Sequence, residues 1–231
     1  MAQASLSHYE AAIADFLKAL DFNPEMPNAY YNLGIAHRDL GNPEKALDYY
    51  SQAIMWRPND PDYYYARGNL LCDTHQYETA LTDYNQAIQI VPGFGNAFYN
   101  RGIAQRNLAA YDEAIADFKH AQELGITTAT VYHNLGLAYS DKGEYSVAIQ
   151  DFTRALEMDQ ELTNAYFGRG NAHANLRQWE SAVSDFSRTI DRRSDFAEAY
   201  RARGTARLEM GDHDGSQADL ERYESLIQEA Q

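Results

Sequence analysis

The chain has 231 residues, 45% of them hydrophobic, and a formal net charge of −15 because 34 acidic residues outnumber 19 basic ones. This balance disfavours nucleic acid and anionic membrane surfaces as partners, because both attract basic residues. A single cysteine, Cys72, excludes an internal disulfide framework. No signal peptide and no transmembrane stretch is visible in the sequence, so we expect a cytoplasmic protein without direct membrane insertion.

The first segment, residues 1–26, matches only the second half of the pattern that fills the rest of the chain. Ala12, Phe16, Ala19 and Pro24 fall on the positions of that pattern. Too few residues precede Tyr9 to form a complete first helix. Either the chain is a segment of a longer protein, which we favour, or its first helix packs in an unusual way.

From residue 27 onward the sequence repeats every 34 residues without insertion or deletion. The six repeats are 27–60, 61–94, 95–128, 129–162, 163–196 and 197–230. Each contains a glycine at the same place: Gly34, Gly68, Gly102, Gly136, Gly170 and Gly204. An aromatic residue precedes each glycine by four residues, and a small residue follows it by twelve, as with Tyr30 and Ala46.

These spacings predict two helices in each repeat. The aromatic residue and the glycine share one face of the first helix, and the small and large apolar residues of the second half form a stripe on another helix. Glycine costs about 1 kcal/mol in a helix interior. Six glycines in register therefore predict a close approach of the second helix, with the small residue of the Ala46 type facing the glycine.

The turn between the two helices and the last repeat complete the pattern. Gly41, Gly143 and Gly211 occupy the turn, where glycine adopts a positive φ easily, and the same place holds His75, Ala109 and Arg177 in other repeats. The second helix of the last repeat is more polar than the others, as the end of a repeat array requires for solubility.

This pattern resembles the tetratricopeptide repeat, a family of 34-residue helix–turn–helix units, over almost the whole chain. The resemblance implies an all-α fold: a right-handed superhelical solenoid of antiparallel helix pairs, with six repeats after an N-terminal half repeat. Residues 1–231 would then form a single solenoid. The first helices would line a concave groove and the second helices the convex back.

A recurrent charge pattern predicts ion pairs between the helices of a repeat. Arginine precedes the repeated glycine in four repeats, and an aspartate follows each arginine by sixteen residues. The pairs are Arg67 and Asp83, Arg101 and Asp117, Arg169 and Asp185, and Arg203 and Asp219. We expect each arginine to pair with this aspartate or with that of the adjoining repeat. The alternative is that both side chains are solvated; Leu135, without a charge, also has its aspartate, Asp151.

The resemblance also indicates which residues line the groove, and these combine aromatic rings with asparagines. Asparagine can donate to and accept from any peptide backbone, and aromatic rings supply rigid contact area. We therefore predict binding of a peptide or helical segment of a partner, unless the rings only pack between neighbouring first helices. The candidate residues are Tyr31, Asn32, Tyr65, Asn69, Tyr99, Asn100, His133, Asn134, Phe167 and Asn171.

The partner chemistry follows from the charges at the same positions. Members of the family that clamp the C-terminal carboxylates of chaperones use three basic residues, and here Tyr65, Thr130 and Asn134 stand in their places. A carboxylate clamp is therefore excluded. Acidic residues outnumber basic ones along the predicted groove, so we expect a protein or peptide partner that is neutral to basic rather than acidic.

No catalytic, metal or cofactor motif is present. The seven histidines show no metal-ligand spacing, and the run beginning at Gly93 lacks the third glycine of a dinucleotide-binding motif. We expect a protein–protein interaction scaffold without enzymatic activity. Two alternatives stay open: a homo-oligomerisation module that pairs, as a homodimer, through an unpartnered apolar face near Ile13, Phe16 and Leu20, and the targeting arm of a larger enzyme.

Overall fold

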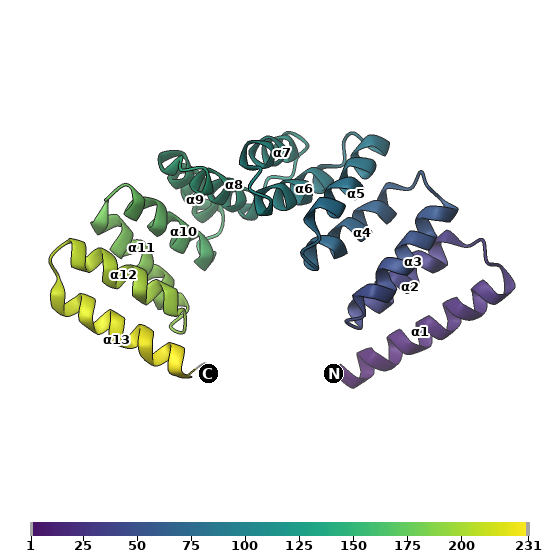
Figure 1. Cartoon of the computed structure of the whole chain (residues 1–231), viewed down its shortest axis with the longest axis horizontal. Helices are drawn as coiled ribbons and strands as arrows, with labels where there is room; N and C mark the ends of the chain where they lie inside the picture. Colours follow the sequence, from purple (N-terminus) through teal and green to yellow (C-terminus); the bar gives the residue numbers. More distant parts are fainter. Residues whose placement is uncertain (1, 230–231) are drawn as a thin grey trace. The chain divides into compact units, whose positions relative to one another are not determined.

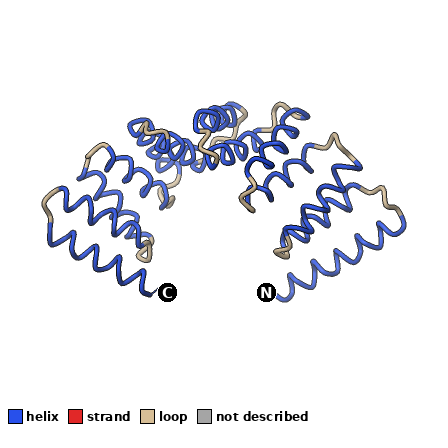
Figure 2. The backbone as a smooth tube through the Cα atoms, viewed as in Figure 1, coloured by secondary structure: helices blue, strands red, loops and turns tan. Residues whose placement is uncertain are grey.

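The structure is a computed structural model that describes residues 2–229, with side chains from residue 9 onward. The described residues form thirteen α-helices and no strand. The chain divides into two compact units, Met1–Ala110 and Tyr111–Gln231. Figure 2 shows that short loops join the helices within each unit.

The N-terminal unit contains one helix without a pair, two complete helix pairs and one further first helix. In chain order these are α1 (Ala2–Phe22), α2 (Pro27–Asp39), α3 (Pro43–Trp56), α4 (Pro61–Asp73), α5 (Tyr77–Ile90) and α6 (Gly95–Asn107). Helices α2 and α3 pack side by side, as do α4 and α5 (Figure 1). Each of α2, α3 and α4 begins at a proline, whose fixed φ suits the first helical position.

The C-terminal unit begins with a second helix and continues with three complete pairs. Its helices are α7 (Tyr111–Glu123), α8 (Ala129–Asp141), α9 (Tyr145–Met158), α10 (Thr163–Asn175), α11 (Trp179–Arg192), α12 (Ala197–Glu209) and α13 (His213–Glu229). The pairs α8/α9, α10/α11 and α12/α13 have the most extensive contacts in this unit, and each second helix also packs on the following first helix (Figure 1).

The turn within each repeat closes the first helix by a recurrent hydrogen-bond pattern. After α2, the N–H of Gly41 donates to the carbonyl of Arg38 and the N–H of Asn42 donates to that of His37. This Schellman arrangement needs a residue with positive φ. Gly41, Gly143 and Gly211 adopt it as predicted, and His75, Ala109 and Arg177 adopt the same conformation without glycine's freedom, at φ of 57–61°.

The repeated glycine lies beneath an aromatic ring of the second helix at Gly34, Gly68, Gly136 and Gly170, whereas Gly204 faces Ser216, Asp219 and Leu220. A Cβ atom on Gly34 would lie 2.5 Å from the Tyr50 ring, and one on Gly170 would lie 2.7 Å from the Phe186 ring. The predicted close approach is therefore confirmed for these repeats, and the nearest atoms are those of the ring. The ring fills the space over the glycine, while the small residue of the Ala46 type is fully buried beside it.

Three of the predicted arginine–aspartate pairs form within their own repeats. Two N–H groups of the guanidinium donate to both carboxylate oxygens at 2.6–2.9 Å in the pairs Arg67–Asp83, Arg169–Asp185 and Arg203–Asp219. A third N–H reaches a hydroxyl on the preceding second helix, which is Ser51, Thr153 or Ser187. Each arginine therefore joins three helices. Arg101 makes the corresponding contact to Asn85.

The first helix packs on the second, and the last helix has a polar outer side. Ile13, Phe16 and Leu20 of α1 pack with Ala29 and Leu33 of α2. Helix α2 of the same chain therefore covers part of this face, and pairing with another copy through the rest of it stays a prediction. The solvent side of α13 is polar, as predicted, with an ion pair between Arg222 and Glu229. No helix in the described part of the chain is long and apolar enough to span a bilayer.

Candidate functional site

A cavity of about 370 Å³ opens on the first-helix face of the N-terminal unit, the surface formed by α2, α4 and α6. Its lining residues are Arg38, Asn69, Cys72, Asp73, Tyr84, Asn100 and Ile103. Two of these, Asn69 and Asn100, are predicted partner-binding residues. They lie at the ninth and sixth positions of successive repeats, so neighbouring first helices bring their amides together.

A chain of hydrogen bonds fixes the orientation of both amides. The buried hydroxyl of Tyr84 donates to Asn69 Oδ1 at 2.9 Å. Asn100 Nδ2 donates to the same oxygen at 2.8 Å and to the Tyr65 hydroxyl at 3.0 Å. Asn69 Nδ2 and Asn100 Oδ1 make no hydrogen bond among the described residues. Two lining residues whose amides are bonded to each other therefore leave a donor group and an acceptor unused.

Burial keeps two further polar groups of this cavity, the Tyr84 hydroxyl and the Cys72 thiol, neutral. It raises the pKa of the Tyr84 hydroxyl, which therefore remains a hydrogen-bond donor. It also raises the pKa of the Cys72 thiol, which is partly buried, so the thiol stays protonated and is a poor nucleophile. On one side of the cavity Arg38 forms a close ion pair with Asp39, at 2.8 Å. Arg38 and Asp73 are thus the charged residues of the cavity wall, and its other lining residues are neutral.

The predicted aromatic residues at the fifth position pack between helices and stay partly exposed. Tyr31 contacts the rings of Tyr50 and Tyr63, with centroids 5.8 and 5.0 Å away. Tyr65 lies 4.9 Å from Phe94. The packing interpretation thus applies to these rings, and the Tyr65 hydroxyl also takes part in the amide network. Asn32 and Tyr99, on the same faces of α2 and α6, are likewise partly buried.

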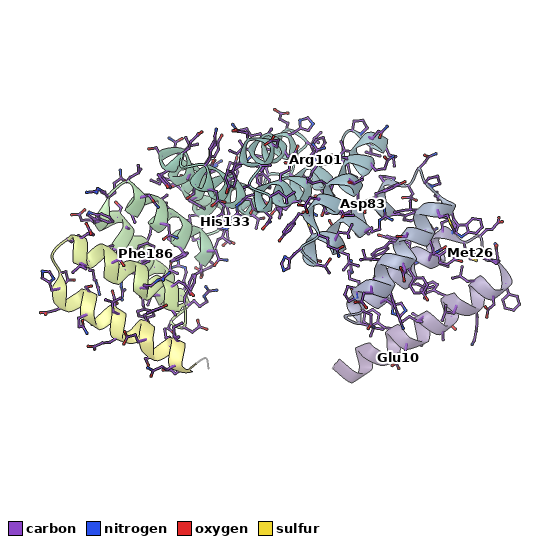
Figure 3. The ribbon with its side chains drawn as sticks, viewed as in Figure 1. Glu10, Met26, Asp83, Arg101, His133 and Phe186 are labelled. Atoms are coloured by element: carbon purple, nitrogen blue, oxygen red, sulfur yellow. The ribbon has the colours of Figure 1, made fainter. Side chains whose placement is uncertain are left out.

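The corresponding residues of the C-terminal unit form a less polar arrangement. The rings of His133 and Phe167 pack on Phe152 and Phe186, with centroids 5.6 and 5.8 Å apart. Asn134 Nδ2 donates to the carbonyl of Thr130 in its own helix. Asn171 lines a second cavity, beside Phe186, which is labelled in Figure 3.

Tyr84, Cys72 and Arg38 line the first cavity although the sequence did not single them out as site residues. Tyr84 occupies a place that is Phe118, Phe152 and Phe186 in later repeats, and it matched the apolar pattern there. The sequence could have indicated the Tyr84–Asn69 hydrogen bond, because the repeat 61–94 combines a tyrosine at this position with an asparagine at its ninth position. No cluster of three or more potential metal ligands occurs among the described residues.

The architecture defines a helical-repeat scaffold: antiparallel helix pairs, a 34-residue period and an aromatic ring over the repeated glycine. Sequence models of the tetratricopeptide repeat match residues 27–60, 94–161, 133–195 and 167–226. A TPR repeat model matches residues 4–41 and 68–108. The chain belongs to the tetratricopeptide-repeat family.

Solved structures of the same fold cover most of the chain. YrrB, described as a TPR protein with an unusual peptide-binding site, is 22% identical, with a TM-score of 0.64 over 77% of this chain and 91% of its own. A tetratricopeptide repeat protein from Parabacteroides merdae is 21% identical, with a TM-score of 0.72 over 96% and 93%. PilW, a type IV pilus biogenesis factor, is 17% identical, with a TM-score of 0.77 over 87% and 92%.

These identities establish similarity of fold alone. In a comparison by sequence, no curated protein matches the chain.

Proposed function

We propose that the chain is a protein–protein interaction scaffold that binds an extended segment of a partner on its first-helix face, with Asn69 and Asn100 at the centre of the site. The observation that carries this proposal is the adjacent free donor and acceptor, Asn69 Nδ2 and Asn100 Oδ1, in the cavity of the N-terminal unit. The remaining candidate residues of α2, α4 and α6 would extend this contact surface, and those of α8 and α10 would contribute to the first-helix face of the C-terminal unit.

A peptide bond offers one N–H donor and one C=O acceptor, so the two amides complement a backbone of any sequence. The Tyr84 and Tyr65 hydroxyls hold the amides in this orientation before a partner arrives. Such preorganisation lowers the entropy that binding must offset. The description of YrrB as peptide-binding is consistent with this use of the fold.

The charges near this site favour a neutral to basic partner. Asp62 and Asp73 are exposed on α4, and the nearest basic group, Arg38, is already paired with Asp39. A free cation of the partner would find unpaired carboxylates here, whereas a carboxylate would find none of the three basic residues that clamp C-terminal carboxylates.

The test compares partner capture by the parent chain with capture by Asn69→Ala/Asn100→Ala, using mass spectrometry to identify the partner and calorimetry with the identified segment. We expect the double variant to lose about tenfold or more in affinity, because two backbone hydrogen bonds disappear. The control is Asn59→Ala, an exposed asparagine in the loop between α3 and α4. A double variant that binds every partner as tightly as the parent contradicts the proposal.

A second candidate is an assembly module, and the burial of α1 favours it. Ala12, Phe16 and Ala19 are only partly buried, whereas their counterparts in α3, such as Ala46 and Tyr50, are fully buried. These side chains therefore retain apolar surface after packing on α2. Sedimentation of the parent and of Phe16→Ser tests this candidate: a dimer that the substitution dissociates supports it, and a parent monomer at all concentrations contradicts it.

A further inference from the structure

We propose that the C-terminal unit has a second recognition pocket of different chemistry, which accepts an apolar side chain of a partner segment that carries an acidic residue next to it. This inference rests on the proposed function, because it assigns a specificity to the first-helix face. The pocket is a cavity of about 400 Å³ formed by α10, α11 and α12.

The pocket lies at the same place in the repeat pattern as the cavity of the N-terminal unit. The second cavity is offset from the first by three repeats in the sequence, so Asn171 corresponds to Asn69 and Phe186 to Tyr84. Three further pairs of lining residues correspond in the same way: Ala174 to Cys72, Ala202 to Asn100 and Thr205 to Ile103. The two cavities are therefore versions of one site in which the side chains differ.

The differences remove every group that holds Asn69 in place. Phe186 has no hydroxyl to donate to Asn171, Ala202 has no amide, and Phe167 replaces Tyr65. The amide of Asn171 consequently makes no hydrogen bond among the described residues. Its donor and its acceptor are both available to a peptide backbone lying across the pocket.

The interior of the pocket is apolar. Phe186 and Ala206 are buried at its base, and Ala174, Trp179 and Ala202 pack around them as partly buried walls. Alanine in place of asparagine at position 202 leaves space that the Asn100 side chain occupies in the other cavity. A hydrocarbon side chain that enters this space leaves water and contacts the alanine methyl groups and aromatic rings of the base and walls.

The positive charge of Arg201 at the pocket favours an acidic residue next to the apolar residue of the partner segment. Among the described residues that line the pocket, Arg201 alone carries a charge. Its guanidinium lies over the Tyr223 ring, 5.6 Å from the centroid, and forms no ion pair among the described residues. A carboxylate of the partner can therefore pair with Arg201, so this pocket prefers an acidic neighbour where the N-terminal site prefers neutral or basic segments.

The experiment uses three blocked tetrapeptides as probes: Gly-Leu-Asp-Gly, Gly-Ser-Asp-Gly and Gly-Leu-Lys-Gly. Binding is followed by the nitrogen–proton resonances of the Asn171 amide and the Trp179 indole, in a Trp56→Phe background that leaves Trp179 as the only tryptophan. We expect the Leu-Asp peptide to bind at least about fivefold more tightly than either of the other two.

Two variants separate the parts of the proposal. Ala202→Asn restores the residue found as Asn32, Asn100 and Asn134, so the fold accommodates it, and it should weaken Leu-Asp binding about tenfold by filling the pocket. Its control is Ala218→Asn, the same change at an exposed site on α13. Arg201→Gln should abolish the preference for Asp over Lys and keep that for Leu over Ser.

The outcomes separate this inference from the proposed function. Peptides that shift the amide resonances of Asn69 and Asn100 but leave Asn171 and Trp179 unchanged would overturn the second pocket alone. Equal binding of the Ser-Asp and Leu-Asp peptides, or an Ala202→Asn variant with the parent's affinity, also overturns it. Probes at about 10 mM that shift none of the four groups would contradict both proposals.

Discussion

Arg169 holds Asp185 with two parallel hydrogen bonds, from Nε to Oδ2 and from Nη2 to Oδ1, each 2.8 Å long. The aspartate side chain is 6% exposed, and a third guanidinium N–H reaches the Thr153 hydroxyl on the preceding second helix. This geometry pairs a nearly buried charge with the guanidinium, with His173 Nε2 a more distant neighbour at 3.9 Å, and it ties α9, α10 and α11 together.

We expect Arg169→Met to lower the free energy of unfolding by about 3 kcal/mol, because it leaves the Asp185 carboxylate buried without a compensating charge. Urea denaturation followed by Trp179 emission in the Trp56→Phe background measures this change. Arg169→Met/Asp185→Leu is the control. It should recover most of the loss, since replacing both members of a buried pair by apolar groups removes the desolvation penalty as well. A loss below about 0.5 kcal/mol for the single variant would argue that the pair is effectively solvated.

Asp151 occupies the place of Asp185 in a repeat where Leu135 replaces the arginine. Burial raises the pKa of Asp151 to about 6, and Lys119 on α7 partly opposes this increase. The folded protein therefore binds this proton more tightly than the unfolded chain. The resulting stabilisation is complete below the ordinary pKa of 3.8 and is lost as the pH rises through about 6.

We expect Asp151→Asn to stabilise the fold by about 1 kcal/mol at neutral pH, a value reduced by solvent screening because the carboxylate is only partly buried. The gain should disappear below pH 3.8, where the parent side chain is itself neutral. Urea titrations of both proteins across this pH range measure the difference. A gain that does not change with pH would show that the carboxylate's charge is not its cause.

The origin of this raised pKa can be tested by introducing at Asp151 the arginine partner that Asp185 has in its own repeat. Lys119 occupies the place that holds Ser51, Thr153 and Ser187 beside the three arginine–aspartate pairs. A cation on the preceding second helix therefore stands where those repeats have a hydroxyl. Leu135→Arg/Lys119→Ser restores both residues. Carboxyl titration by NMR should then place the pKa of Asp151 below that in the parent. An unchanged pKa would mean that the new arginine does not reach the carboxylate.

The sequence predicted the helix pairs, the turns and the ion pairs because each depends on a spacing that recurs at 34 residues. The side chain nearest to each repeated glycine was harder to predict, because spacing identifies the residues that share a helix face but not which of their side chains reaches the glycine. For Gly34 that side chain is Tyr50 rather than Ala46. The amide network of the site involves hydroxyl direction and contacts between neighbouring repeats. A pattern read one repeat at a time does not contain that information.

The turn at Arg177 offers a stabilising substitution that contacts alone would not suggest. Arg177 adopts φ of 57°, which costs an L-residue about 1 kcal/mol, and its side chain is exposed. Arg177→Gly should therefore raise the free energy of unfolding by about 0.5–1 kcal/mol, despite the greater freedom of glycine in the unfolded chain. Gly143→Ala, at the equivalent turn with φ of 86°, is the converse control and should destabilise the protein. Urea denaturation measures both, and a destabilised Arg177→Gly would contradict the argument.

The two buried tyrosines of the second helices should respond oppositely to loss of their hydroxyls. The Tyr84 hydroxyl donates to Asn69 Oδ1. The Tyr50 hydroxyl is buried and has no hydrogen-bond partner among the described residues, because Ile35 stands in the place of Asn69. Burial also raises the pKa of Tyr50 to about 12, so its hydroxyl remains neutral. We expect Tyr84→Phe to cost about 1 kcal/mol of unfolding free energy.

Tyr50→Phe should be neutral or stabilise by up to about 1 kcal/mol, because it removes an unsatisfied polar group and installs the residue found in three later repeats. Denaturation with urea measures both effects, and spectra of the Asn69 and Asn100 side-chain amides add a second observable. Those resonances should broaden or shift in Tyr84→Phe and stay unchanged in Tyr50→Phe, because only Tyr84 orients the site. Equal losses of stability in the two variants would mean that the hydroxyls act through packing, and that the amides of the candidate site are not held by Tyr84.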